Sequence, residues 1–335
     1  MPTKASRLSW RNGNLFGGTG EVMRDILRRP IAHFRLPIAN WHLAILASAL
    51  IVLSSVSSAV PQTKTDSHSN RPKPSMSVEA KALLEEAMGV VCTQAKLDPN
   101  SSVAIDEMQA RPSLPVEHPE ALAGAERAQR LLPVAKNLVI TSLRQLATEY
   151  GFHKSPRFQK RINQAILRVN AVTRVRPDME SRDNASVYLS RPRVITFGTI
   201  FLAGLRSDEG MISVLAHELM HIADGENDSL RPLVAAVGKN VSELTGLDIH
   251  GQRGEEITCD LIGAMAARTY IAGTPGYESI ARRLARSIQH NCVEQDEGDE
   301  DHLSPRNTIR ALLALHPVLV RELINDREER TPIRK

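Results

Sequence analysis

Two histidines and a glutamate in one short stretch, "VLAHELMHIADGE" (214–226), have the types and spacing needed for metal-dependent hydrolysis. His217 and His221 are four residues apart, so on a helix both imidazoles project from one side, one turn apart. This spacing lets both rings bind a single Zn²⁺ ion at ~2.0–2.1 Å. Glu218 is displaced around the helix, so it can reach a water on the metal but is poorly placed as a ligand. The motif predicts a zinc hydrolase centre. The competing interpretation is an ordinary helix that carries two histidines by chance.

A third ligand must come from elsewhere, because catalytic zinc usually has three protein ligands and one water. The downstream candidates are Asp224, Glu226, His250, Glu255, Glu256, Cys259 and Asp260. Asp224 and Glu226 are too close to the end of the motif helix to fold back onto the metal. Asp224 and Asn227 also exclude the H-E-x-x-H-x-x-G-x-x-H pattern.

The best candidates lie in "RGEEITCDLIGAMAARTY", where Glu256, Asp260, Gly263 and Ala264 share one helical face. One carboxylate a turn before another suits a ligand followed by a partner that orients a ligating histidine. The small residues Gly263 and Ala264 would let this helix pack closely on the motif helix. Close packing is needed if side chains from two helices are to meet at one ion.

"HELMH" followed by "EITCDLIG" resembles the H-E-x-x-H … E-x-x-A-D-x-x-G pattern of the HtpX and CAAX-prenyl-protease type of zinc metalloendopeptidase. This is peptidase family M forty-eight, a gluzincin group, and the resemblance covers about 183–315. It implies His217, His221 and Glu256 as ligands of one Zn²⁺ per subunit. It also implies Glu218 as general base and Asp260 as the residue that orients a ligand.

The sequence departs from the family pattern at Cys259, where the family usually has Ala. Cys259 is therefore an alternative ligand in place of Glu256, because thiolates bind zinc well. Glu255 is a weaker alternative, since it lacks the four-residue relation to Asp260.

Near the C-terminus, "DHLSPRNTIRALLALHP" partly resembles the family's His-Pro element with its following Arg-Ile pair. His302 fits, whereas Leu303 replaces Pro and Thr308 stands where Arg is usual. On this partial match we expect a catalytic role for His302, as a donor to the oxyanion of the reaction. Arg306 and Arg310 are the alternatives for that role.

These residues predict a zinc-dependent endopeptidase whose substrate is a protein or peptide of the cell envelope. The substrate would lie as an added strand beside the strand near Val187 or Ile195. The alternative function is an envelope chaperone or assembly factor with latent protease activity. A purely structural zinc site is disfavoured, because Glu218 would have no role and structural sites usually have four ligands.

The N-terminal region predicts a membrane segment. Residues 37–63 contain no Lys, Arg, Asp or Glu, and basic residues are more numerous before the apolar run 43–60, with seven in 1–40, than in the linker after it, with three in 61–77. The positive-inside rule then keeps the N-terminus cytoplasmic and places the remaining chain outside, in the periplasm. The segment is either an uncleaved signal anchor or a signal peptide that is cut after Ala59. The translation start is either Met1 or Met23.

Composition supports an α+β, mostly helical protein, because the aromatic content is only 4% while 42% of the 335 residues are hydrophobic. The net charge of +4 owes much to the N-terminal tail and does not predict nucleic-acid binding. The three cysteines do not form a disulfide framework; either Cys92 and Cys292 are bridged, or all three, including Cys259, are free.

We expect a zincin-like catalytic domain with a small β-sheet or hairpin beside the H-E-x-x-H helix, preceded by one membrane segment. The expected divisions are a basic cytoplasmic tail (1–40), the membrane segment (41–60), a linker (61–77) and the catalytic domain (78–335). The expected strands are 185–190 and 193–201, and the expected helices are 78–97, 121–150 with a break or kink at Pro133, one around 162–169, 207–224, 230–247, 254–272, 277–290 and 305–324.

Overall fold

The computed structural model describes residues 76–97, 110–188, 190, 192–225, 227, 229–274, 283 and 298–328. All of them belong to one compact unit, Asn70–Lys335. The expected basic tail, the membrane segment, nearly all of the linker and all of the expected helix 277–290 except residue 283 lie outside the described residues. Among the helices that are described, none combines the length and hydrophobicity needed to span a membrane.

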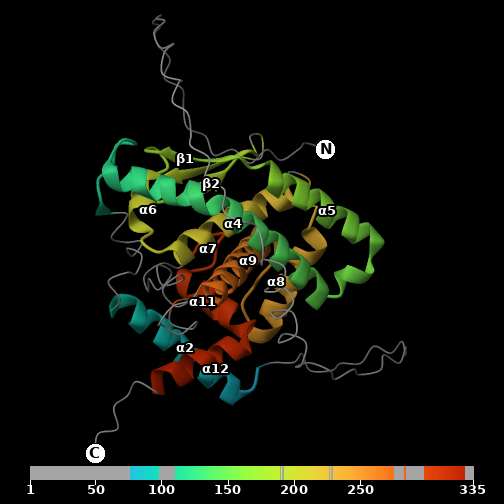
Figure 1. Ribbon diagram of the computed structural model, residues 1–335. Coiled ribbons are helices and arrows are strands. Elements are labelled where there is room, and N and C mark those ends of the chain that lie inside the picture. Colours follow the sequence, from blue (N-terminus) through green and yellow to red (C-terminus); the bar gives the residue numbers. More distant parts are fainter. Residues whose placement is uncertain are drawn as a thin grey trace, which may run out of the picture. The chain divides into compact units, whose positions relative to one another are not determined.

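The described part is mostly helical with one small sheet, so the coarse prediction of a mostly helical α+β protein is confirmed (Figure 1). In chain order the helices are α2 (Val78–Leu97), α4 (Pro119–Glu149), the 3₁₀ helix η1 (Phe152–Lys154), α5 (Pro156–Ala171), α6 (Thr199–Gly204), α7 (Asp208–Asp224), α8 (Arg231–Thr245), α9 (Gly251–Gly273), α11 (Pro305–Ala314) and α12 (Pro317–Glu328). The strands are β1 (Arg174–Asp178), β2 (Ala185–Val187) and β3 (Val194–Gly198).

The sheet has the strand order β1-β3-β2, with β1 parallel and β2 antiparallel to β3. The pairing of β2 with β3 confirms the expected strand pair. Strand β1 was not expected, because its sequence "RVRPD" combines two arginines with a proline. Proline has no backbone N–H to donate to a neighbouring strand, but it is tolerated in an edge strand such as β1.

Strand β3 ends earlier than expected. The apolar run does not continue as a strand to Phe201, because the chain turns into α6 at Thr199. Gly198 is required at this junction, since a Cβ there would lie 2.0 Å from the carbonyl oxygen of Arg182. The close approach of these two backbones holds the 179–184 turn against the end of the sheet.

Prolines inside two of the expected helices have different effects on the structure. Helix α4 continues through Pro133 without a break. Its buried residues lie on both sides of the proline, and their packing favours one continuous helix. The expected single helix 305–324 is wrong, because α11 ends at Ala314 and α12 begins at Pro317. The residue before a proline is disfavoured in the helical conformation, and proline is favoured at the first helical position, so His316-Pro317 divides the run.

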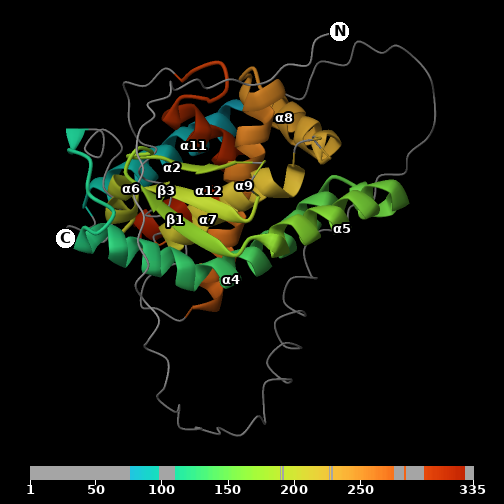
Figure 2. The ribbon, with the colours of Figure 1, turned by 90° about the horizontal axis from the view of Figure 1, so that it is seen from above.

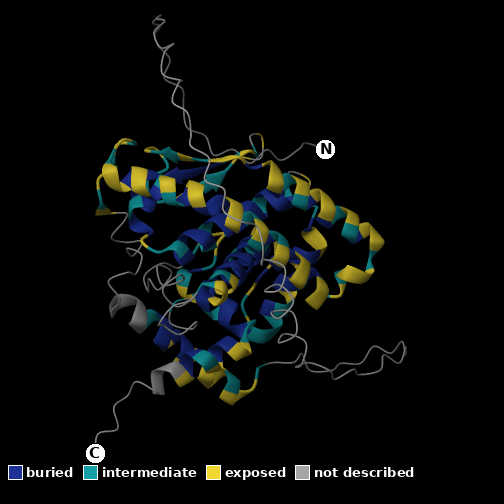
Figure 3. Cartoon of the chain, in the orientation of Figure 1, coloured by how far each residue is buried: buried dark blue, intermediate teal, exposed yellow. Residues whose placement is uncertain are grey.

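Helix α7, which carries the H-E-x-x-H motif, lies at the centre of the main hydrophobic core (Figures 1 and 2). It packs against α4, α5 and α9, and it also contacts β2. Ser207 is the N-cap of α7, because its hydroxyl accepts a hydrogen bond from Gly210 N at 3.0 Å. A second cluster joins α2, α11 and α12 to the C-terminal half of α9. Figure 3 shows these inner helix faces as buried.

The cysteines differ in state. Cys92 on α2 is disulfide-bonded, whereas Cys259 on α9 is a free, buried thiol. The alternative of three free thiols is therefore wrong. Cys292, the remaining cysteine of the sequence, lies outside the described residues.

Candidate metal centre

The centre is built where α9 crosses α7 at very short range. A Cβ at Gly263 of α9 would lie 2.7 Å from the carbonyl oxygen of Ser213 on α7, so only glycine fits there. The expected close approach of the two helices at Gly263 is thereby confirmed. Ser213 is one helical turn before His217, and Gly263 is close to two turns after Glu256. The contact therefore brings the acidic face of α9 opposite the histidine face of α7.

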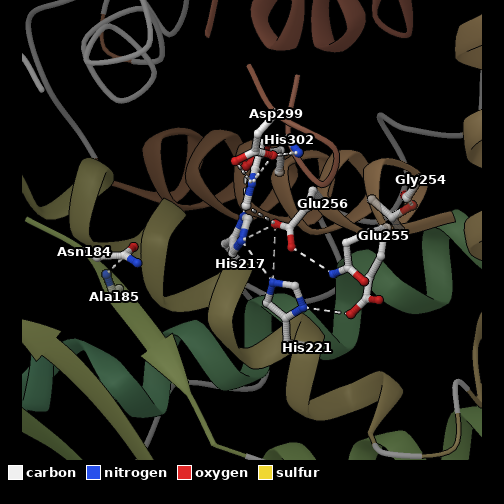
Figure 4. A network of polar contacts seen from close by, with 12 residues as sticks. Asn184, Ala185, His217, His221, Gly254, Glu255, Glu256, Asp299 and His302 are labelled. Atoms are coloured by element: carbon white, nitrogen blue, oxygen red, sulfur yellow. Dashed lines mark hydrogen bonds and ion pairs between the residues drawn. The ribbon is translucent and has the colours of Figure 1, made fainter. Parts of the chain in front are cut away.

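Three donor atoms meet between these helices (Figure 4). The Nε2 atoms of His217 and His221 are 3.2 Å apart, and Glu256 Oε2 lies 3.3 Å from the first and 3.5 Å from the second. Ligands bound tetrahedrally to zinc at ~2.0–2.1 Å are roughly 3.3–3.4 Å from one another. The three atoms thus have the mutual spacing of three corners of a tetrahedral zinc site.

The proton positions on the two histidines also fit a metal site. His217 Nδ1 lies 2.9 Å from Asp260 Oδ1, and His221 Nδ1 lies 2.9 Å from Glu255 Oε1. An ionised carboxylate only accepts hydrogen bonds, so each Nδ1 carries the proton that it donates. In the neutral rings both Nε2 lone pairs then face each other and the Glu256 oxygen. Three electron-rich atoms that converge in this way need a positive charge between them, from a bound cation or from protons on the rings, and the donor set fits Zn²⁺.

The acid–base properties reflect the same crowding of negative charge. Burial alone would lower the pKa of His217, but its hydrogen bonds to Asp260 and Glu256 raise it well above the ordinary value. The pKa of His221 is raised too, because its neighbours, Cys259 and Glu255 among them, outweigh the opposing effect of burial. Burial alone would raise the pKa of Glu256, but hydrogen bonds from both histidines lower it below its ordinary value. In the absence of a metal, protonated imidazoles would supply the missing positive charge.

Glu218, the expected general base, is nearly fully buried on α7 beside the two histidines, with 6% of its surface exposed. Burial raises its pKa, while the charges of His217 and His221 oppose that rise. A carboxylate whose pKa is raised is a better proton acceptor for work near neutral pH than an ordinary exposed one.

Cys259 is close enough to compete with Glu256 as the third ligand. A possible ligand set of His217, His221 and Cys259 has all of its donor atoms within 4.8 Å of one another. However, burial raises the pKa of the Cys259 thiol and disfavours the thiolate that binds metal. Because Glu256 Oε2 lies at the spacing of a tetrahedral ligand from both histidines, at 3.3 and 3.5 Å, and its pKa is lowered, we favour Glu256.

His302 approaches the same carboxylate from the loop before α11. Its Nε2 lies 3.8 Å from Glu256 Oε2, and its Nδ1 lies 3.1 Å from Asp299 Oδ1. The ring is 59% exposed, whereas Glu256 is only 11% exposed, so His302 lies at the solvent side of the centre. The alternatives Arg306 and Arg310 instead pair with Glu85 of α2.

Three further residues take part that sequence reasoning did not assign. Glu255 orients His221, and Asp299 orients His302. Gln252 donates through Nε2 to Glu256 Oε1 at 3.2 Å, which leaves Oε2 facing the histidines. Gln252 precedes Glu256 by four residues, so helical spacing could have indicated it. Nothing local indicates Asp299, because its contact depends on the fold of the 298–304 loop.

Among the described strands, one edge of the sheet lies near the centre. Ile195 belongs to β3, which is paired on both sides and fully buried there, so a substrate strand beside Ile195 is excluded. Val187 belongs to β2, an edge strand of the described sheet that contacts α7. Figure 4 draws Asn184 and Ala185, where β2 begins, on the side of the centre next to His217.

The acidic residues inside the opening stretch do not join the centre. Asp224 Oδ1 accepts a short hydrogen bond from Leu230 N and shapes the turn into α8, while Glu226 lies outside the described residues. His250 is exposed and pairs with its neighbour Asp248 at 3.0 Å.

Comparisons with protein-family models, with curated proteins and with solved structures find no significant match to this chain. The functional conclusion therefore depends on the geometry of the centre itself.

Proposed function

We propose that this chain is a zinc-dependent endopeptidase with a zincin-like catalytic domain, in which His217, His221 and Glu256 hold one Zn²⁺. The observation that carries the proposal is the convergence of two Nε2 atoms and one carboxylate oxygen at 3.2–3.5 Å, next to a buried glutamate. The likeness of "HELMH" and "EITCDLIG" to the HtpX and CAAX-prenyl-protease type of metallopeptidase supports the same activity.

Zinc, when bound, supplies Lewis acidity toward the scissile carbonyl and toward the attacking water. The roles of the chain's own residues follow from their positions. Glu218 accepts the proton of the attacking water and delivers it to the leaving amine. Asp260 and Glu255 hold the two ligating rings in one tautomer. His302, held by Asp299 at the solvent side, donates to the developing oxyanion.

The substrate is a protein or peptide in an extended conformation that adds to the free edge of β2. Its main chain would then pass beside α7, which β2 contacts. The disulfide at Cys92 supports an oxidising, extracytoplasmic compartment, because structural disulfides are rare in the cytosol. Envelope proteins are accordingly the expected substrates, and the membrane segment 41–60 would keep the domain at that site.

The test is cleavage of an unfolded protein substrate by the full chain and by Glu218→Gln. Glutamine preserves the size of the side chain but cannot accept the proton, so zinc should be retained while cleavage is lost by at least about 100-fold. Glu209→Gln, a buried glutamate on the same helix that pairs with Arg283 away from the centre, is the matched control. Full activity of Glu218→Gln would overturn the proposal, and so would an equal loss in the control.

A further inference from the structure

A basic surface lies outside the metal centre, on η1, α5 and β1. Residues 151–177 contain seven Lys and Arg and no Asp or Glu. Two of the seven serve the fold: Arg161 donates to the carbonyl of Ser229, and Arg168 donates to the carbonyls of Ile222 and Ala223. The other five are exposed and define the basic ridge: Lys154, Arg157, Lys160, Arg174 and Arg176. None of these five forms an ion pair with another described residue.

The stability of α5 does not explain these charges. Cations near a helix N-terminus oppose the helix dipole, and α5 has no acidic residue in its first turn. Helices α2, α4 and α7 follow the rule with acidic residues in their first turns, whereas α8, α9 and α11, like α5, carry an arginine there and no acidic residue. On α5, Arg157 and Lys160 add to the positive end of the dipole, so the local positive field is strengthened.

The outer side of α5 also carries an exposed apolar residue. The buried stripe of this helix is formed by Phe158, Ile162, Ala165 and Val169. Leu167 and Lys160, seven residues apart, lie on the opposite side, and Leu167 is 70% exposed. Figure 3 shows this outer side of α5 as largely exposed. An exposed leucine on the same side of a helix as an unpaired lysine suits a surface that meets anionic lipid headgroups.

We propose that the basic ridge, with Leu167, docks onto the surface of an anionic lipid bilayer. Charge complementarity carries this choice of partner: each cation near such a surface strengthens binding by about fivefold. Five cations alone give weak binding, but a tether to the same membrane raises the effective concentration of the ridge at the bilayer surface. The expected membrane segment 41–60 and the linker 61–77 would supply that tether, because 17 extended residues span at most about 60 Å.

The full chain is reconstituted in nanodiscs of phosphatidylcholine, with or without phosphatidylglycerol, and an environment-sensitive dye is attached at Leu167→Cys. We expect a blue-shifted emission and protection from a soluble quencher only with phosphatidylglycerol. Both effects should vanish at about 1 M salt, where the Debye length is ~3 Å. The triple variant Lys154→Glu, Arg157→Glu and Lys160→Glu should lose both effects even at low salt.

The triple variant should remain folded, because glutamates suit the start of α5 better than cations do. The matched control reverses three exposed cations on other helices: Lys81 on α2, Arg231 on α8 and Arg321 on α12. Equal emission in both lipid compositions would overturn the proposal, as would an equal loss in the control variant. Protection by a soluble polyanion in phosphatidylcholine nanodiscs would overturn it too, because the partner would then not be the bilayer. Peptidase activity plays no part in these readouts.

Discussion

Gly263 of α9 faces Ser213 of α7 so closely that a Cβ on the glycine would lie 2.7 Å from the serine carbonyl oxygen. Neither backbone can move without moving a candidate metal ligand, since both helices carry such residues. The close contact between the two helices therefore also determines the distances between the donor atoms.

Gly263→Ala should consequently lower both stability and zinc affinity. The added methyl group overpacks a backbone contact, which costs about 1–3 kcal/mol of unfolding free energy. Gly273→Ala is the control on the same helix, because a Cβ there meets nothing within 4 Å. It should be neutral or stabilise by up to about 1 kcal/mol. Chemical denaturation of both variants checks this, and equal stabilities would contradict the close-contact interpretation.

Glu255→Ala should weaken zinc binding by about 10–100-fold, because His221 loses the partner that fixes its tautomer. Glu255→Gln should recover part of the loss, since its amide oxygen still accepts from Nδ1. Competition with a chromophoric chelator measures the affinities. Asp248→Ala, which removes the exposed His250–Asp248 pair, is the control and should leave zinc affinity unchanged. A similar loss in both variants would argue against a positioning role for Glu255.

Arg168 fastens the end of the motif helix, because its guanidinium donates to the carbonyls of Ile222 and Ala223 and to Ser229 Oγ. Arg168→Met should lower the free energy of unfolding by about 2–3 kcal/mol, since it removes charge-assisted hydrogen bonds at the negative end of α7. Arg157→Met, an exposed position on the same helix, should change it by less than about 0.5 kcal/mol. Thermal unfolding of the two variants distinguishes them; indistinguishable midpoints would contradict this role.

His316 should make the fold sensitive to acid. Burial first, and then the charge of Arg268, lower its pKa to about 4. In the unfolded chain the pKa is ~6.5, so between these values the unfolded state binds more protons. Its contribution, up to about 3 kcal/mol, is therefore complete above pH ~6.5 and is lost as the pH falls toward about 4. His316→Gln should flatten this part of the stability profile, whereas His153→Gln, at an exposed position, should not. An unchanged slope in His316→Gln would refute the assignment.

Much of the helical fold could be predicted from the sequence, because its signals are local. Ser207 with Asp208 and Glu209 marks the start of α7, and the apolar spacing marks its length. The predictions failed at positions where tertiary contacts determine the secondary structure. Strand β1 exists because β3 offers a parallel partner, and the strand-to-helix change at Thr199 depends on Gly198 meeting the Arg182 backbone.

The candidate centre shows the same division. His217, Glu218, His221, Glu256 and Asp260 could be selected by helical spacing, and the structure brings them together between α7 and α9. The residue that orients His221 could not be predicted in this way. Glu255 and Glu256 are adjacent, and only the crossing of the two helices decides which carboxylate faces which ring. The placement of His302 depends in turn on Asp299, which belongs to a loop.

The central claim is that His217, His221 and Glu256 bind one zinc ion, and zinc content of the purified full chain tests it most directly. We expect about one zinc per chain in the wild type and in Cys259→Ala, and a large loss in Glu256→Ala, because a catalytic site needs three protein ligands. A wild type without zinc, or a Cys259→Ala variant that loses zinc while Glu256→Ala keeps it, would contradict the claim.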